Sequence, residues 1–158
     1  MTESNRMGFT RLRDLLAVAL VAAVLSFLVI LLSYQRIPPL PRFAGLAAAL
    51  VGIGEAVAGF GLRSRIRPHD PSEPGAIRKP VPPLTAARAV MTAKATSLAG
   101  AAVGGLWVGL LVYVVPSWSE LEAARSDGIT GIVGLAGALV MIGGAVFLEH
   151  CLRAPGVR

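Results

Sequence analysis

Residues 15–32 read LLAVALVAAVLSFLVILL, eighteen residues without a charge. A helix rises about 1.5 Å per residue, so this stretch is about 27 Å long, close to the hydrocarbon thickness of a bilayer. It is longer than the apolar core of a cleaved signal peptide, about 7–15 residues, and residues 33–36 offer no small-residue cleavage site. We therefore interpret residues 15–32 as a retained membrane-spanning helix.

Three further segments are apolar and long enough to cross a bilayer: residues 43–62, 95–115 and 129–148. Of the 158 residues, 54% are apolar and only 15% are charged. Soluble domains carry about 25% charged residues, and disordered chains have low hydrophobicity, so the composition excludes both classes. We predict an all-α integral membrane protein with four transmembrane helices in a single domain, residues 1–158.

The distribution of basic residues predicts the orientation of these helices. Twelve of the fifteen Lys and Arg residues lie before the first span, between the second and third spans, or after the fourth. Basic residues accumulate in cytoplasmic loops, so we predict a plasma-membrane protein with both termini in the cytoplasm. Aromatic side chains typical of membrane interfaces stand at the opposite ends of the spans, at Tyr34, Tyr113 and Trp118.

The connections between the spans differ in character. The connection from Ser33 to Arg42 is short and contains PPLP at residues 38–41, which favours an extended turn because proline fixes φ and has no amide donor. We therefore expect the first two spans to pair as an antiparallel hairpin. Residues 63–84 hold six of the eleven prolines, which predicts a basic cytoplasmic linker without a core of its own. Thr85 is expected to cap the third helix.

Small residues predict how the helices associate. Lipid chains are as apolar as leucine, so membrane helices attract one another mainly where small side chains let their backbones approach. The third span contains Gly100, Gly104, Gly105 and Gly109 at suitable spacings. We predict that this helix is central to the packing, with its partner either in the same chain or in another copy.

Glu55 is the one charged residue inside the second span, and it lies near the middle of that segment. A carboxylate at this depth costs about 2.5–3.5 kcal/mol on insertion scales. Three interpretations stay open: a structural polar contact, a carboxyl group that couples to a proton or cation, or a shallower segment with Glu55 near the interface. Lys94, at the inner end of the third span, is the preferred partner, unless Lys94 and Arg88 extend to lipid headgroups instead.

Other polar residues offer weaker signals. Residues 149–151, Glu-His-Cys, provide too few ligands for a zinc site, which wants about four, so we expect neither a metal nor a cofactor. Basic residues that flank the linker either contact anionic lipid headgroups or only set the topology: Arg63, Arg65, Arg67 and Arg88. We expect no nucleic-acid partner, because no known binding motif is present.

Five short stretches together resemble a known family: residues 11–15 (RLRDL), 38–41 (PPLP), 86–89 (AARA), 93–95 (AKA) and 148–153 (LEHCLR). In this order they are similar to the actinobacterial membrane proteins grouped as domain of unknown function 3180. The resemblance implies a small four-helix plasma-membrane protein and implies no activity. Glu55 lies outside the matching stretches.

These observations favour a non-enzymatic membrane protein, a scaffold or assembly partner of a larger envelope complex. Its partners would be the lipid bilayer and either other membrane proteins or further copies of itself. The alternative is a small oligomeric transporter that couples to protons or cations through Glu55.

Overall fold

The computed structural model describes residues 12–33, 41, 43–66, 83–119 and 122–152. Its helices cover Leu12–Ser33 (α1), Leu46–Ile66 (α2), Pro83–Val114 (α3) and Glu122–Cys151 (α4), with a short 3-10 helix, η2, at Val115–Ser117. The described chain is therefore all-α, as predicted. Helices α1, α3 and α4 are long and apolar enough to cross a membrane, whereas the apolar part of α2 is shorter.

Two helices extend into the predicted linker. Helix α2 continues to Ile66, and α3 begins at Pro83, two residues before the expected cap. A proline is tolerated in the first turn of a helix, where its missing amide hydrogen has no intrahelical acceptor. The rest of the predicted linker, residues 67–82, lies outside the described residues.

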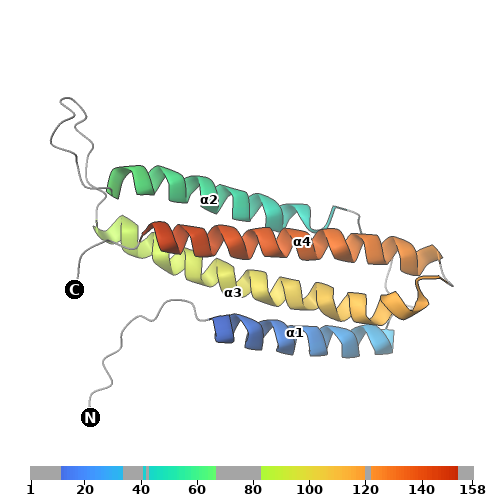
Figure 1. The fold of residues 1–158 in the computed structure, drawn as a ribbon. Helices are drawn as coiled ribbons and strands as arrows, with labels where there is room; N and C mark the ends of the chain where they lie inside the picture. The colour runs from blue at the N-terminus through green and yellow to red at the C-terminus, as the bar shows by residue number, and fades with distance from the viewer. Residues whose placement is uncertain (1–11, 34–40, 42, 67–82, 120–121, 153–158) are drawn as a thin grey trace, which may run out of the picture.

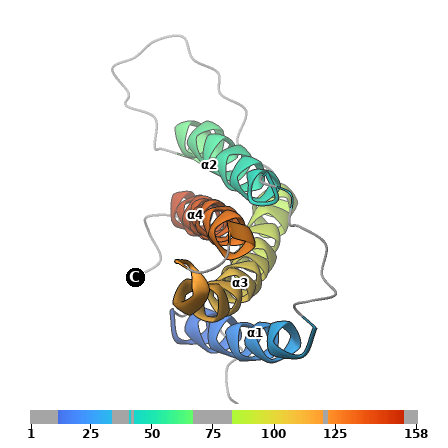
Figure 2. The same ribbon diagram turned by 90° about the vertical axis from the view of Figure 1, so that its right-hand side faces the viewer.

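The helices form one row in the order α1, α3, α4, α2 (Figures 1 and 2). Helix α1 packs on α3, α3 packs on α4, and α4 packs on α2. The expected hairpin of the first two spans is wrong, because α1 and α2 lie at opposite edges of this row (Figure 1). The small residues of α1 match those of α3, and the glycines of α2 match those of α4, so pairing follows surface shape and not the length of the connection.

Gly105 and Gly109 bring α3 against α1. A Cβ atom on Gly105 would collide with the carbonyl oxygen of Ala19, and one on Gly109 would collide with the carbonyl oxygen of Ala23. Both glycines are buried by this contact. Because the contacting residues advance together along the two helices, α1 and α3 run in the same direction.

A hydrogen bond and an aromatic pair add to the contact between α1 and α3. The hydroxyl group of Ser26 donates a hydrogen bond of 2.9 Å to the carbonyl oxygen of Leu106. Farther along, the rings of Phe27 and Tyr113 meet edge to face, with their centroids 6.3 Å apart. Such aromatic geometry is favourable beyond the area that it buries.

Gly100 and Gly104 are buried on the face of α3 that meets α4. A Cβ atom on Gly100 would lie 2.8 Å from the side chain of Ile142. Farther along α3, the indole ring of Trp107 lies directly on Gly134, where no larger side chain would fit. The contacting residues of the two helices advance in opposite senses, so α3 and α4 are antiparallel.

Helices α4 and α2 approach backbone to backbone through glycines spaced by seven residues. A Cβ atom on Gly137 would collide with the carbonyl oxygen of Gly45, and one on Gly144 would collide with the carbonyl oxygen of Gly52. This spacing is two helical turns, so the glycines of each helix lie on one face. The two helices run in the same direction, with residue i of α2 beside a residue about ninety positions later in α4.

Three helices share a hydrophobic cluster at one end of the row. Ile30 of α1, Val114 of α3 and Ala124 of α4 are buried together there. The chain turns from α3 into α4 at this end through η2, and the ring of Trp118 then covers Gly128. The short connection at this end joins α3 and α4 as neighbours in the row.

Large apolar side chains remain exposed on every helix. Examples are Leu20 of α1, Val57 of α2, Val112 of α3 and Leu139 of α4, each more than half exposed. Soluble monomers rarely expose contiguous apolar surface on this scale. The exposure is typical of helices that lipid or other membrane helices surround.

Candidate intramembrane site around Glu55

Glu55 lies at the border of the contact between α2 and α4. It follows Gly52 by three residues and precedes Gly59 by four, and both glycines are buried against α4. The side chain of Glu55 is half-buried. Its Oε2 atom is buried without a hydrogen-bond partner in the described part of the chain. One end of the carboxyl group is thus enclosed without a donor, while another part of the side chain remains accessible.

The depth of Glu55 follows from the glycine contacts of α2. Gly52 lies beside Met141, and a Cβ atom on Gly59 would lie 3.3 Å from the Cα atom of Leu148. Glu55 is therefore level with Gly144, about 6 Å from the predicted inner end of the fourth span. The pairing of glycines thus places Glu55 nearer the C-terminal end of α4 than the middle of that helix.

The structure does not bring Glu55 and Lys94 together. Lys94 lies on α3 and is exposed, whereas Glu55 lies on α2, and α4 separates these two helices in the row. The buried oxygen of Glu55 has no partner, whereas Lys94 has a partner of its own. The expected pair is therefore not formed, because α4 lies between the two helices. The two residues nevertheless lie at similar levels along α4.

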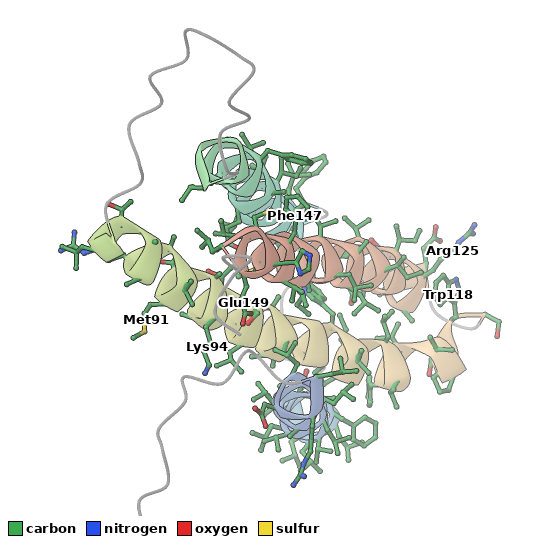
Figure 3. The ribbon with its side chains drawn as sticks, turned by 60° about the vertical axis from the view of Figure 1, so that its left-hand side comes forward. Met91, Lys94, Trp118, Arg125, Phe147 and Glu149 are labelled. Atoms are coloured by element: carbon green, nitrogen blue, oxygen red, sulfur yellow. The ribbon has the colours of Figure 1, made fainter. Side chains whose placement is uncertain are left out.

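A second acidic residue, Glu149, is more deeply buried than Glu55. Only 5% of its surface is exposed, and it lies at the same end of the row as Lys94 (Figure 3). In the antiparallel register of α3 and α4 it is level with Ala93, which is fully buried. Glu149 entered the sequence analysis only as one of too few ligands for zinc. It follows buried Ala145 by four residues and so lies on the same face of α4, but the burial of that face depends on the register with α3 and could not be read from the sequence.

The neighbours of Glu149 in sequence do not assemble a reactive group. Cys151 is a free, buried thiol at the end of α4, and His150 is exposed beside it. Within the described ranges, no three His, Cys, Asp or Glu side chains gather closely enough to hold a metal ion. Glu149 and Cys151 are both buried at this end of the row.

The remaining candidate residues are the basic residues near the linker and the glycines of α3. Arg88 is exposed in the first third of α3, and Arg63 and Arg65 belong to the last turns of α2. Arg67 lies outside the described residues. The four glycines of α3 serve two neighbours, because Gly100 and Gly104 face α4 whereas Gly105 and Gly109 face α1.

The comparisons with known proteins give a family and no activity. The family model described as "Protein of unknown function (DUF3180)" matches residues 15–156, which include most of the chain and every described helix from the first turn of α1 onward. No curated protein matches the chain, and no solved structure matches it. The chain belongs to the DUF3180 family.

Proposed function

We propose that this chain is a non-enzymatic, four-span plasma-membrane protein that acts as a scaffold or assembly partner for other membrane proteins. The observation that carries the proposal is the open row of helices. Among the described elements, each edge helix packs mainly on one neighbour, and apolar side chains are exposed along all four helices. Such a row encloses little and offers long surfaces to other helices, which suits assembly better than catalysis.

The directions of the helices support four crossings. Helices α1 and α3 run in the same direction, and both are long and apolar enough to span a membrane. If both cross, the chain must return between Ser33 and Pro83, and α2 is the helix that lies in this interval. Gly45, directly before α2, meets α4 at Gly134, twelve residues after α4 begins. Helix α2 therefore begins about 18 Å along α4 from the first residue of α4.

The orientation rests on the charges at the two ends of the row. The start of α1, the end of α2, the start of α3 and the end of α4 lie together at one end (Figure 1). The described basic residues there are Arg13, Arg63, Arg65, Arg88 and Lys94, whereas Arg125 is the described basic residue at the other end. This distribution supports a cytoplasmic location for the first end.

Cysteine labelling tests this orientation. In a background with Cys151→Ala, a cysteine at Ser119 should react with an impermeant thiol reagent on intact cells, and a cysteine at Thr85 should not. Both positions are exposed, so the difference reports the side of the membrane and not burial. Labelling at position 85 alone would show that the orientation is opposite to the predicted one. Permeabilised cells, in which both should react, provide the control.

Purification in a mild detergent tests the assembly role. The tagged full chain should retain one or more membrane proteins at a fixed ratio after size-exclusion chromatography, and mass spectrometry would identify them. An unrelated four-span protein of the same size, expressed at the same level, controls for nonspecific adhesion. Recovery of the chain alone, as a monomer in lipid nanodiscs, would contradict the proposal.

The buried, unpartnered oxygen of Glu55 favours transport as a second candidate. A carboxyl group without a partner inside a membrane protein is a typical site for a proton or a small cation. Reconstituted protein would then support a proton or cation flux that Glu55→Gln abolishes. The position of Glu55 near the inner end of the row weighs against this role, because a coupling site is expected nearer the middle of the membrane.

A further inference from the structure

The four apolar segments of the chain are not level with one another in the row. These segments are residues 15–32, 43–62, 95–115 and 129–148. Figure 1 shows α1 (blue) toward the end of the row where α3 turns into α4, and α2 (green) toward the opposite end. A flat bilayer has to cover all four segments at the same depth, so their relative levels determine how the row lies in the membrane.

Contacts between neighbouring helices give the size of this shift. Gly105 of α3 lies against Ala19 and Ala22 of α1, so a residue of α1 is level with the residue of α3 about 84 positions later. Helix α4 is registered on α3 by Trp107 on Gly134, and α2 is registered on α4 by its glycines. The middles of the four segments are then level with these residues of α3: Val108 for α1, Gly105 for α3 itself, Val103 for α4 and Ala99 for α2.

The shift has the same direction at every step across the row. From Val108 to Ala99 it amounts to about nine residues, or about 13 Å along the helices. Packed helices lie about 8–10 Å apart, so the axes of the two edge helices are about 24–30 Å apart. The four segments are therefore level in one bilayer only if the row leans by about 25–30° within its own plane.

The basic residues at the ends of the segments are shifted in the same way. Arg13, Lys94 and Arg63 each stand within two residues of an apolar segment. Along α3, Arg13 is level with Leu98 and Arg63 is level with Arg88, so Lys94 lies between them. Long basic side chains keep their charge at the headgroups, so these three residues are expected at one depth. The lean that levels the apolar segments also brings them to one depth.

An upright row would place several exposed residues in the wrong environment. A bilayer centred on the apolar segment of α3 would then enclose Arg13 and Asp14, both of which are exposed. It would leave Phe60, which is 62% exposed, outside the hydrocarbon. Charged side chains are costly inside a membrane, and an exposed phenyl ring is favourable there, so the upright placement is disfavoured at both edges.

We infer that the row crosses the bilayer tilted by about 25–30° in its own plane, so that the lipid chains cover α1 farther toward the turn between α3 and α4 and cover α2 farther toward the opposite end. Transmembrane helices are tilted by about 20° on average, with a range of about 0–40°, so the angle is an ordinary one. The inference rests on the four crossings proposed above and does not depend on the assembly role.

The tilt changes what the level of Glu55 along α4 means for the transport candidate. In an upright row, Glu55 would lie about 13 Å from the centre of the bilayer, close to its inner boundary. In the tilted row it lies about 3–4 Å from the centre, because it stands about two to three residues from the middle of residues 43–62. This is the depth at which a coupling carboxyl group is expected, so its level weighs against transport only if the row is upright.

Nitroxide labels measure the tilt in the full chain. In the Cys151→Ala background, single cysteines carry a spin label, and the protein is reconstituted in vesicles of phosphatidylcholine and phosphatidylglycerol. Electron paramagnetic resonance then compares the collision rate of the label with oxygen, which concentrates in the hydrocarbon, and with a polar nickel chelate, which is excluded from it. The ratio of the two rates reports depth and cancels local shielding.

Two pairs of positions, each pair level in the row and divided between its two edges, decide the result. Leu16 of α1 and Leu50 of α2 are 60% and 63% exposed. In the tilted row the label at Leu50 should lie about 3 Å from the centre of the bilayer and the label at Leu16 about 10 Å from it. The order should reverse in the second exposed pair, with about 1 Å for Val24 of α1 and about 13 Å for Phe43 before α2.

An upright row would place the two labels of each pair at equal depth, and a row that leans the other way would reverse the order in both pairs. Either result would overturn the tilt, as would labels on one edge that are the deeper ones in both pairs.

The same labels separate the tilt from the proposed four crossings. If the nickel chelate reaches a label at Leu50 as freely as a label at exposed Ser119, α2 does not cross the bilayer, and both the four crossings and the tilt are wrong. If all four labels are protected from the chelate but the pairs are equal in depth, the four crossings stand and only the tilt is wrong.

Discussion

Leucine at Gly144 should detach α2 from α4 and lower the free energy of unfolding by about 3 kcal/mol or more, at the upper end of overpacking effects. A Cβ atom at this position would collide with the carbonyl oxygen of Gly52, and its next closest neighbours are also backbone atoms of Gly52. Backbone atoms in a helix cannot rotate away as a side chain does, so the helices must separate. Chemical or thermal unfolding in lipid nanodiscs measures the loss.

The adjacent glycine provides a matched control. A Cβ atom on Gly143 would meet no described atom within 4 Å. Gly143→Leu makes the same chemical change one residue away, and it should leave stability nearly unchanged or raise it slightly, since leucine favours a helix over glycine. Gly52→Leu and Gly54→Leu form the corresponding pair on α2, with the same expected contrast. Equal stability of Gly143→Leu and Gly144→Leu would show that α2 does not pack on α4 through these glycines.

Leucine at Gly105 should release α1 from α3 and cost about 2–3 kcal/mol of stability through overpacking. A Cβ atom there would collide with the carbonyl oxygen of Ala19 and would lie 2.8 Å from the Cβ atom of Ala22. Helix α1 packs mainly on α3, so its contacts with other helices compensate little for the loss. The measurement is again unfolding in nanodiscs, in which release of α1 should appear as an early transition.

Val112→Leu on the same helix is the control for this second prediction. Val112 is 57% exposed, so an added methylene group projects outward and should change stability by less than about 0.5 kcal/mol. If Gly105→Leu and Val112→Leu unfold alike, the close contact between α1 and α3 is not a source of stability.

Much of the architecture could be predicted from the length of each apolar segment, which is a property of that segment alone. The stretches at residues 15–32, 95–115 and 129–148 correspond to α1, α3 and α4, because each can be recognised without knowing its neighbours. The glycine ladder of α3 was also visible in the sequence. Its division between two neighbours, with Gly104 toward α4 and Gly105 toward α1, was not, since spacing alone does not name a partner.

The errors concern properties that belong to pairs of helices. The hairpin of the first two spans was inferred from a short connection, but the match between Gly45 and Gly137 directs α2 to α4. The same match sets how far α2 is shifted along α4, so the level of Glu55 relative to α4 could not be obtained from its position within its own segment. Burial of Glu149 depends likewise on the register between α3 and α4, which no local pattern specifies.

Both tryptophans of the chain rest on glycines of α4, Trp107 on Gly134 and Trp118 on Gly128. Indole emission is sensitive to the polarity and rigidity of its surroundings, so the protein contains two intrinsic optical probes of the same helix pair, one within the row and one at its end. Replacing either by Phe leaves a single emitter. Opening between α3 and α4 during folding or partner binding is then observable without an attached dye.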